Sequence, residues 1–216
     1  KGECEELDAI IIDTDSRFDD PRTAADKVAQ ATRLLQELPC DRYFNKTCSV
    51  FRGNIGAEFD SMQDVLGISC SMVIAGFPGN GRTTVDGDSQ FRTDPIHPMD
   101  ISFLPDIMSR QTDRKIRQIT WEDLDKGLEH VIGKKEELKK QCAYILFDIR
   151  HQEDLKLVAR AVADEINLCG SSAIGEELPA AIREMCEDGQ DPVFLIAGSL
   201  TRQSIAQTEY LRGKGY

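Results

Sequence analysis

Residues 42–67 read "RYFNKTCSVFRGNIGAEFDSMQDVLG", and this stretch decides the fold because a strand, a turn and a helix follow one another in it. Residues 42–46 have the composition of a short strand. Four apolar residues beyond the turn recur at the spacing of one helical face: Ile55, Phe59, Met62 and Leu66. Gly67 follows them, at a position where glycine often ends a helix. The stretch therefore predicts a β-α unit.

The same alternation of strand and helix extends along the chain. Short apolar runs predict further strands at 7–13, 70–77, 115–119 and 144–149. Helical spacing, capping residues and prolines predict further helices. One begins at Pro21 and is capped by Asp20, and another runs from Thr120 to Ile132 with a capping box to Asp123. The others lie over 101–108, with an interruption at Pro105, over 153–166, and toward Cys186. We therefore expect an α/β fold, a mostly parallel sheet with helices on both faces in a Rossmann-like layered architecture.

A polar stretch divides the chain near its end. Residues 187–191 contain acids and a glycine ahead of a proline, which indicates a linker. Residues 1–186 then form one α/β domain, and 192–216 supply one more strand and helix, too little for a second core. We interpret 192–216 as the beginning of an incomplete C-terminal domain. Residues 78–98 predict a long loop, and loops of that length are usually functional or disordered.

The composition excludes several classes of protein. The 216 residues include 26 Lys and Arg against 38 Asp and Glu, a net charge of -12, which argues against nucleic acid or an anionic membrane as partner. No apolar run approaches the roughly 20 residues of a spanning helix, and the acidic start does not resemble a signal peptide, so we expect a cytoplasmic protein. The seven cysteines form no Cys-x-x-Cys pair, which argues against a disulfide framework or a zinc site.

The turn at 47–54 is the first candidate site. Lys46 precedes it and Arg52 lies within it, and a helix capped by Asn54 after Gly53 would direct free backbone N–H groups into the same crevice. At the carboxyl end of a parallel strand, such a turn is where ligands bind. The alternative is that Lys46 and Arg52 form ion pairs with surface acids. The sequence favours an anion site here.

Two other loops carry polar groups. The segment "DTDSR", 13–17, ends the first predicted strand, so Asp15, Ser16 and Arg17 would reach the same edge of the sheet. A turn in which Asp15 and Ser16 form local hydrogen bonds explains this segment equally well. The segment "FPGNGRTTVDGD", 77–88, is Gly-rich and carries Arg82, which suits a phosphate or carboxylate. It is not a Walker motif, because no Gly-Lys-Ser/Thr follows.

Several segments together resemble the four-carbon acid sugar kinases, which phosphorylate acids such as threonate and erythronate with ATP. They are "TDSR" at 14–17, "RGNIGAEFD" at 52–60, "FPGNGRT" at 77–83, "DPIHP" at 94–98, "GSSAIGEEL" at 170–178 and "GSLTRQSIAQ" at 198–207. The resemblance implies an N-terminal sugar-acid domain, here 1–186, and a C-terminal nucleotide-binding domain that begins at 192. It implies substrate-binding roles for a set of residues: Arg17, Lys46, Ser49, Arg52, Gly53, Asn54 and Arg82. It also implies that Ser199 contacts the nucleotide.

The chain departs from the family pattern in places. The family usually begins with an Asp-Asp-Leu-Thr-Gly type segment that is not seen here, and "KTCSVFRGN" has Cys48 where an Asp is usual and Val50 where a Thr is usual. The stretch 87–94 is also shorter than the family leads us to expect. We expect these departures to mark a fragment, a changed substrate or lost activity.

The resemblance predicts an ATP-dependent kinase of a four-carbon sugar acid, with this chain supplying the part that binds the acid. Asp15 is the candidate catalytic base, ATP and Mg²⁺ are the expected cofactors, and no metal ligand is assigned in this chain. The expected partners are the sugar acid and ATP, without nucleic acid or membrane, and a homodimer is left open. The alternative is a non-catalytic sugar-acid-binding module or a degenerate relative.

Overall fold

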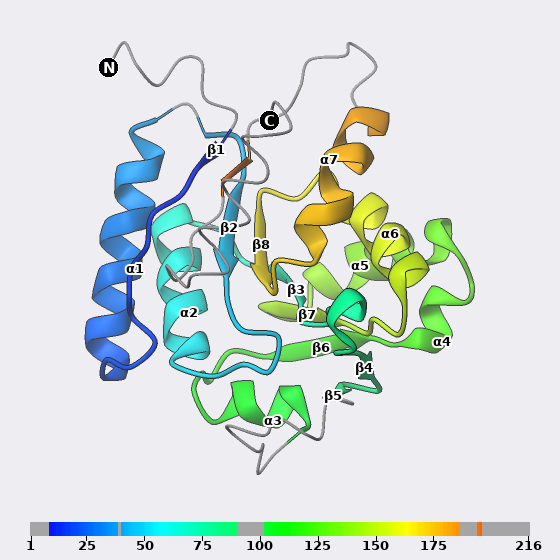
Figure 1. The fold of residues 1–216 in the computed structure, drawn as a ribbon, viewed down its shortest axis with the longest axis horizontal. Coiled ribbons are helices and arrows are strands. Elements are labelled where there is room, and N and C mark those ends of the chain that lie inside the picture. Colours follow the sequence, from blue (N-terminus) through cyan, green and yellow to red (C-terminus); the bar gives the residue numbers. More distant parts are fainter. Residues whose placement is uncertain (1–8, 39, 90–101, 186–193, 196–216) are drawn as a thin grey trace.

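The computed structural model describes residues 9–38, 40–89, 102–185 and 194–195. Its centre is a five-stranded sheet in the order β2-β8-β3-β7-β6, and all of its neighbouring strands are parallel. The strands are β2 (Tyr43–Lys46), β3 (Ser71–Ile74), β6 (Ile116–Ile119), β7 (Tyr144–Phe147) and β8 (Asn167–Gly170). Helices cover the sheet on both sides (Figure 1). The expected α/β architecture is confirmed.

Alternate side chains of the strands enter two different cores. On β3, Met72 and Ile74 pack in one core, while Val73 and the following Ala75 pack in the other. The first core is completed by α4 (Trp121–Leu124), α5 (Leu128–Lys139), α6 (Gln152–Ala161) and α7 (Ile174–Met185), and the second by α2 (Ile55–Leu66) and α3 (Leu104–Ser109). Strands β3 and β7 are buried on both faces, which explains their largely apolar sequences.

Helix α1 (Pro21–Gln36) lies against α2, on the outer side of that layer (Figure 1). Its start matches the sequence: the Asp20 carboxylate accepts hydrogen bonds from the backbone N–H groups of Arg22 and Thr23, both at 3.1 Å, and Pro21 occupies the first turn. Val28 and Leu35 of α1 pack against Met62 of α2 and bury the seam between the two helices.

Some predicted elements have different bounds in the structure. The strand expected at 7–13 is short within the described residues: β1 (Ala9–Ile10) pairs in parallel with β9 (Phe194–Leu195). The proline at 105 lies in the first turn of α3, where its missing N–H costs nothing, and so it does not interrupt the helix. The predicted linker 187–191 lies outside the described residues, as does 192–216 apart from β9.

Two predicted helices are wrong in extent. Asp123 accepts a hydrogen bond from the Thr120 N–H at 3.3 Å, as the capping box requires, but the helix expected over 120–132 is divided into α4 and α5. Gly127, with a φ of 89°, is the N-cap of α5, and this non-helical conformation separates the two helices. The helix expected over 153–166 ends at Ala161, and the chain then enters β8, which the sequence did not predict.

The loop predicted over 78–98 contains regular structure where it is described. A 3₁₀ turn, η1 (Pro78–Asn80), leads into a hairpin of β4 (Thr84–Val85) and β5 (Asp88–Ser89). Asp86 and Gly87 form its turn with φ values of 51° and 77°, as a tight hairpin turn requires. Residues 90–101 lie outside the described residues.

The connections of β2 and β8 determine where a ligand can bind. The chain leaves β2 toward α2 in one layer and leaves the adjacent β8 toward α7 in the opposite layer. When two neighbouring parallel strands send their connections to opposite faces, a crevice opens at their carboxyl ends. This edge of the sheet therefore holds the candidate site. None of the helices in the described ranges has the length and apolar character needed to cross a bilayer.

Candidate functional site

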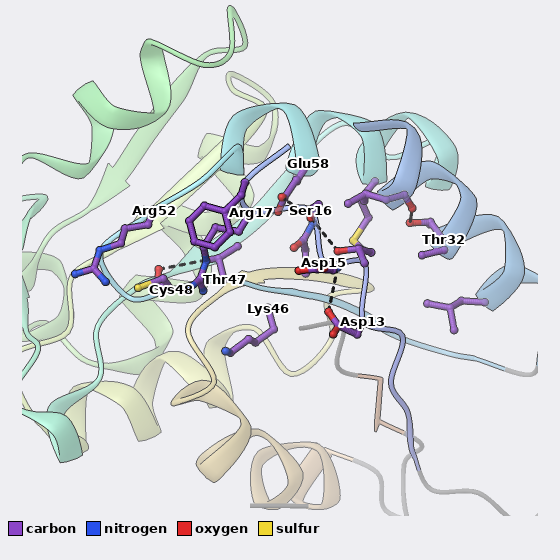
Figure 2. A pocket seen from close by; sticks show the side chains of 17 residues that line it. Asp13, Asp15, Ser16, Arg17, Thr32, Lys46, Thr47, Cys48, Arg52 and Glu58 are labelled. Carbon is purple, nitrogen blue, oxygen red and sulfur yellow. Dashed lines mark hydrogen bonds between the residues drawn. The ribbon is translucent and has the colours of Figure 1, made fainter. Parts of the chain in front are cut away.

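A crevice lies at the carboxyl end of β2, between the segment 13–18 and the start of α2. Segment 13–18 forms one wall, Lys46, Thr47, Cys48 and Arg52 form another, and Glu58 of α2 lies at the back (Figure 2). Apolar side chains of α1, such as Val28 and Leu35, line its deeper part. The structure thus brings together the two loops that the sequence singled out separately.

Backbone and side-chain hydrogen bonds fix the segment 13–18. The N–H of Asp15 donates to Oδ1 of Asp13 at 3.0 Å, and Asp15 has a φ of 42°. Lys27 of α1 donates to the Asp15 carbonyl oxygen at 3.1 Å and forms an ion pair with Asp19 at 2.6 Å. Ser16 is buried, and its hydroxyl contacts Thr14 in the same segment and Glu58 of α2, so a turn closed by local backbone hydrogen bonds does not account for this side chain. The side chain of Asp15 remains exposed at the crevice.

The turn after β2 approaches this segment closely. Gly53 has a φ of 96°, and a Cβ atom there would lie 3.1 Å from Cγ of Arg17 and 3.2 Å from its carbonyl oxygen. A side chain at position 53 would therefore disturb Arg17. Phe51, with a φ of 52°, is buried under the turn.

Asn54 precedes α2 as predicted, but its side chain does not cap the helix. Its amide nitrogen instead donates to the carbonyl oxygens of Ser16 at 3.2 Å and Asp19 at 2.8 Å. The N–H of Gly56, in the first turn of α2, donates to Oε1 of Gln111 at 3.1 Å. The expected side-chain cap by Asn54 is therefore wrong, because its amide connects this turn to the segment 16–19. Gln111 takes the N–H of Gly56, one of those expected to be free for a ligand.

Two cations of the crevice lack acidic partners. Within the described ranges, neither Arg17 nor Lys46 forms an ion pair or a side-chain hydrogen bond. Burial lowers the pKa of Lys46, the charge of Arg17 lowers it further, and Cys48 opposes the shift. In a chain with a net charge of -12, two cations in one crevice without an ion pair to a described residue favour an anionic ligand, although the charge of Arg17 also acts on Glu58. Arg52 also lines the crevice.

Other predicted residues lie behind the crevice. The hydroxyl oxygen of buried Ser49 accepts a hydrogen bond from Nη1 of Arg82 at 3.2 Å, which joins the turn after β2 to the Gly-rich loop. Neither residue lines the crevice, and neither do Gly53 and Asn54. These four residues shape the loops that carry Arg17 and Lys46. Ser199 lies outside the described residues.

Glu58 was missed in the sequence. It lines the crevice with only 8% of its surface exposed. The signal was an acidic residue on a helical face that otherwise carries Ile55, Phe59 and Met62, because an acid on a buried face requires a polar partner.

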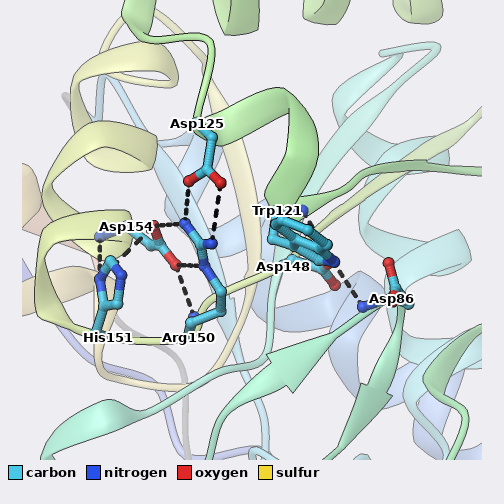
Figure 3. Close-up of polar contacts among 7 residues, drawn as sticks. All are labelled: Asp86, Trp121, Asp125, Asp148, Arg150, His151 and Asp154. Atoms are coloured by element: carbon cyan, nitrogen blue, oxygen red, sulfur yellow. Dashed lines mark hydrogen bonds and ion pairs between the residues drawn. The ribbon is translucent and has the colours of Figure 1, made fainter.

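A separate group of polar side chains follows β7 and is structural. Arg150 donates to Asp154 at 2.8 Å and to Asp125 at 2.6 Å, and its guanidinium lies 5.5 Å from the centroid of the Trp121 ring (Figure 3). These hydrogen bonds raise the pKa of Arg150. The group joins the end of α4 to the start of α6.

The described residues offer no carboxylate cluster that suits Mg²⁺. Glu136, Asp164 and Glu165 converge, but Nζ of Lys135 lies 2.7 Å from Asp164 and 2.8 Å from Glu165, and Lys139 is also 2.8 Å from Glu165. Ammonium groups thus take the place that a metal ion would need. No step that involves Mg²⁺ or ATP follows from these residues.

The fold and the crevice place the chain among layered α/β proteins that bind small ligands at the carboxyl edge of the sheet. A protein family described as "sugar-binding N-terminal domain" matches residues 2–178. With this match and the relatives below, the chain belongs to the four-carbon acid sugar kinase family.

The relatives agree with this assignment. The chain is 30% identical over 191 residues to a 3-oxo-tetronate kinase of Haemophilus influenzae, an alignment that covers 82% of this chain and 46% of the relative. It is 30% identical over 228 residues to a D-erythronate kinase of Heliobacterium modesticaldum, covering 94% and 51%. A D-threonate kinase of Salmonella typhimurium is 26% identical over 221 residues, covering 94% and 51%. The chain thus spans about half the length of these curated relatives.

Solved structures show the same fold. A Haemophilus influenzae protein assigned to a family of unknown function superposes with a TM-score of 0.69 and 28% identity, over 82% of this chain and 45% of that one. A Salmonella typhimurium protein described as a putative tRNA synthase also gives a TM-score of 0.69, with 25% identity over 77% and 44% of the two chains.

Proposed function

We propose that this chain is the sugar-acid-binding part of an ATP-dependent kinase that phosphorylates a four-carbon sugar acid of the threonate or erythronate type. The observation that carries the proposal is the pair of cations, Arg17 and Lys46, which line one crevice and form no ion pair with a described residue. The relatives are named as kinases of 3-oxo-tetronate, D-threonate and D-erythronate, which supports the substrate class.

In this proposal the substrate carboxylate lies between Arg17, Lys46 and Arg52. A guanidinium and a carboxylate can form two parallel hydrogen bonds, and an ammonium adds a point charge, so the acid end of the substrate is fixed in position and direction. Ser49, Gly53, Asn54 and Arg82 support the site by shaping its loops. Asp15, exposed at the crevice, is the proposed acceptor for the proton of the hydroxyl that is phosphorylated.

The nucleotide is proposed to bind mainly to the part of the kinase that begins at residue 192, with Ser199 on the nucleotide side. Phosphoryl transfer depends largely on positioning and charge stabilisation, and ATP with Mg²⁺ supplies the phosphoryl group when bound. The contribution of this chain is to hold the acid and exclude alternative orientations. By itself, it should bind ATP poorly.

Calorimetric titration of the chain with threonate, erythronate and the neutral sugar alcohol threitol tests the proposal. We expect both acids to bind and threitol to fail, because it lacks the carboxylate. Arg17→Met, which keeps the aliphatic stem that contacts Gly53, should weaken acid binding about 10-fold or more, given roughly 1.5–3 kcal/mol for a charge-assisted hydrogen bond. Arg160→Met, on the outer surface of α6, is the matched control.

A second arm tests the proposed role of Asp15. Asp15→Asn should leave acid binding within about threefold and abolish ATP-dependent phosphorylation in a chain that carries the nucleotide-binding half. Binding of threitol as tight as threonate, or unchanged acid binding in Arg17→Met, would remove the sugar-acid assignment.

A further inference from the structure

Glu58 is buried at the back of the crevice and makes one hydrogen bond. Its Oε1 accepts a hydrogen bond from the Ser16 hydroxyl at 2.7 Å (Figure 2). In the part of the chain that the structure describes, no hydrogen bond reaches its other carboxylate oxygen, Oε2. This oxygen also keeps some contact with solvent. Oε2 is therefore an acceptor that a ligand can reach from the crevice.

The surroundings of Glu58 make such an open oxygen costly. The side chain is 8% exposed, and burial raises its pKa, opposed by the hydrogen bond from Ser16 and the charge of Arg17. No ion pair to a described residue compensates it. A largely buried carboxylate oxygen needs a hydrogen-bond donor, which water in the open crevice or a hydroxyl group of a ligand can supply.

An anchoring role for Ser16 does not explain the second oxygen. One acceptor is enough to hold the Ser16 hydroxyl, and Thr14 already lies 2.9 Å from the same hydroxyl. The side chain of Asn54 fixes the same segment through the backbone carbonyl oxygen of Ser16. The segment would thus remain attached to α2 without a carboxylate at position 58.

The chemistry of the crevice divides into two parts. Arg17 and Lys46 attract any carboxylate, and they cannot distinguish a sugar acid from a plain fatty acid of the same length. A hydroxyl group is recognised by a positioned acceptor, because a site built to hydrogen-bond a hydroxyl rejects an analogue that lacks it. Glu58 is a buried carboxylate that lines this crevice, and it has an oxygen without a hydrogen-bond partner among the described residues.

We propose that Glu58 is the specificity-determining residue of this crevice and that its Oε2 accepts a hydrogen bond from a hydroxyl group of the bound acid. This inference rests on the proposed function, since it takes a hydroxylated acid as the ligand. It assigns the carboxylate of the ligand to Arg17 and Lys46 and a hydroxyl to Glu58.

The test compares threonate with butyrate, a four-carbon acid without hydroxyl groups, by calorimetry. Wild type should bind threonate at least about 10-fold more tightly than butyrate, since butyrate cannot make the hydrogen bond to the charged Glu58. Glu58→Met has a side chain of similar length without a carboxylate acceptor. It should bind threonate more weakly and so lose most of this affinity ratio, while its affinity for butyrate should be unchanged or higher. Glu129→Met, at an exposed position in the first turn of α5, is the matched control.

A third variant separates recognition from anchoring. Ser16→Ala removes the hydrogen bond to Oε1 and leaves Oε2 in place, so the threonate to butyrate ratio should stay within about threefold of wild type even if stability falls. Circular dichroism and thermal unfolding confirm that each variant is folded before it is titrated. A ratio that survives in Glu58→Met, or that falls equally in Ser16→Ala, would overturn the assignment of Glu58.

The outcomes also separate this inference from the proposed function. If wild type binds both acids equally, the cationic site stands and the role of Glu58 fails. If wild type binds neither acid, the proposed function fails, and the role of Glu58 fails with it.

Discussion

The side-chain amide of Asn54 donates a hydrogen bond to the backbone carbonyl oxygen of Asp19 across 2.8 Å. A second bond from the same amide reaches the carbonyl oxygen of Ser16 at 3.2 Å. Asn54 therefore acts as a donor between two loops, whereas an N-cap side chain acts as an acceptor for the helix. This difference predicts how substitutions at position 54 behave.

Asn54→Asp should destabilise the protein, although aspartate is as good an N-cap residue as asparagine. The carboxylate cannot donate, and it would face two carbonyl oxygens. We expect a loss of about 1–3 kcal/mol in the free energy of unfolding, measured by urea denaturation, as for a buried hydrogen bond left without its partner. Asn54→Ala should cost about as much or less. Unchanged stability in Asn54→Asp would show that the side chain caps α2 after all.

Gly53→Ala should weaken binding of the acid as well as stability. The added Cβ would lie 3.1–3.3 Å from atoms of Arg17, at a φ of 96° that disfavours alanine. Gly67→Ala is the matched control, because Gly67 also has a positive φ, of 67°, but a Cβ there meets nothing within 4 Å. Both variants should lose about 1 kcal/mol to backbone strain. Only Gly53→Ala should lower affinity for threonate in calorimetry, and equal affinities in the two variants would contradict the contact with Arg17.

The local features of the fold could be predicted because each depends on neighbours in sequence. Asp20 and Pro21 begin α1, and Gly67 ends α2, as the capping patterns indicated. These signals act within one or two helical turns, and tertiary contacts do not override them here. The position of Lys46 at the carboxyl end of β2 followed from the same reasoning.

Strand β8 could not be predicted because its residues are stabilised by distant contacts. Asn167–Gly170 contains only two apolar side chains, and the strand exists because it is inserted between β2 and β3. Its Gly170 has a φ of 135°, and a Cβ there would lie 1.9 Å from the carbonyl oxygen of Ile74. The side chain of Asn167 donates to Ser71 at 2.8 Å, 96 residues away in sequence. Such contacts leave no local pattern.

The candidate site was predictable in part for the same reason. Arg17, Lys46 and Arg52 stood out as cations after predicted strands, and the crevice contains all three. The contact between Ser16 and Glu58 joins residues 42 positions apart, and the one between Ser49 and Arg82 joins residues 33 apart. Spacing along the chain does not reveal which polar groups face the ligand and which support the loops.

Affinity for an anionic ligand should fall at alkaline pH because of Lys46. Burial and the charge of Arg17 hold its pKa below the usual 10.5, so it loses its proton, and its attraction for an anion, earlier than an ordinary lysine. Titration with threonate from pH 7 to 10 should show affinity that decreases with pH. Lys46→Arg should reduce this decrease, since arginine stays charged, and Lys46→Met should lower affinity about 10-fold at pH 7.

The same pKa shift predicts an effect on stability with the opposite sign. The pKa of Lys46 is lower in the folded protein than in the unfolded chain, so a charged Lys46 lowers the free energy of unfolding at neutral pH. This loss of stability disappears as pH rises through the folded-state pKa toward 10.5. Lys46→Met should therefore raise the melting temperature at pH 7 in the absence of ligand. Lys140→Met, at the exposed end of α5, should not. A lower melting temperature in Lys46→Met would contradict the penalty that burial and the charge of Arg17 impose on the charged lysine.

Asp148→Asn should destabilise the hairpin beside the sheet and leave the crevice intact. Both carboxylate oxygens of Asp148 accept backbone hydrogen bonds: Oδ2 from the N–H groups of Asp86 at 2.7 Å and Trp121 at 3.1 Å, and Oδ1 from Gly87 at 2.9 Å (Figure 3). An asparagine has one acceptor oxygen, and its amide nitrogen would face a backbone N–H. We expect a loss of about 1–3 kcal/mol in the free energy of unfolding.

The matched control for this variant is Asp125→Asn. The Asp125 carboxylate accepts hydrogen bonds from the Arg150 side chain at the surface, so this substitution should change the free energy of unfolding by less than about 1 kcal/mol. Hydrogen exchange should locate the damage from Asp148→Asn. The N–H groups of Asp86, Gly87 and Trp121 should exchange faster, because they lose their acceptor, while amides of β2 and α2 keep their protection. Threonate affinity should then match wild type, since Asp148 does not line the crevice. If threonate affinity falls together with stability, the hairpin and the crevice form one cooperative unit. The end of β7 would then not be independent of the binding site at the end of β2.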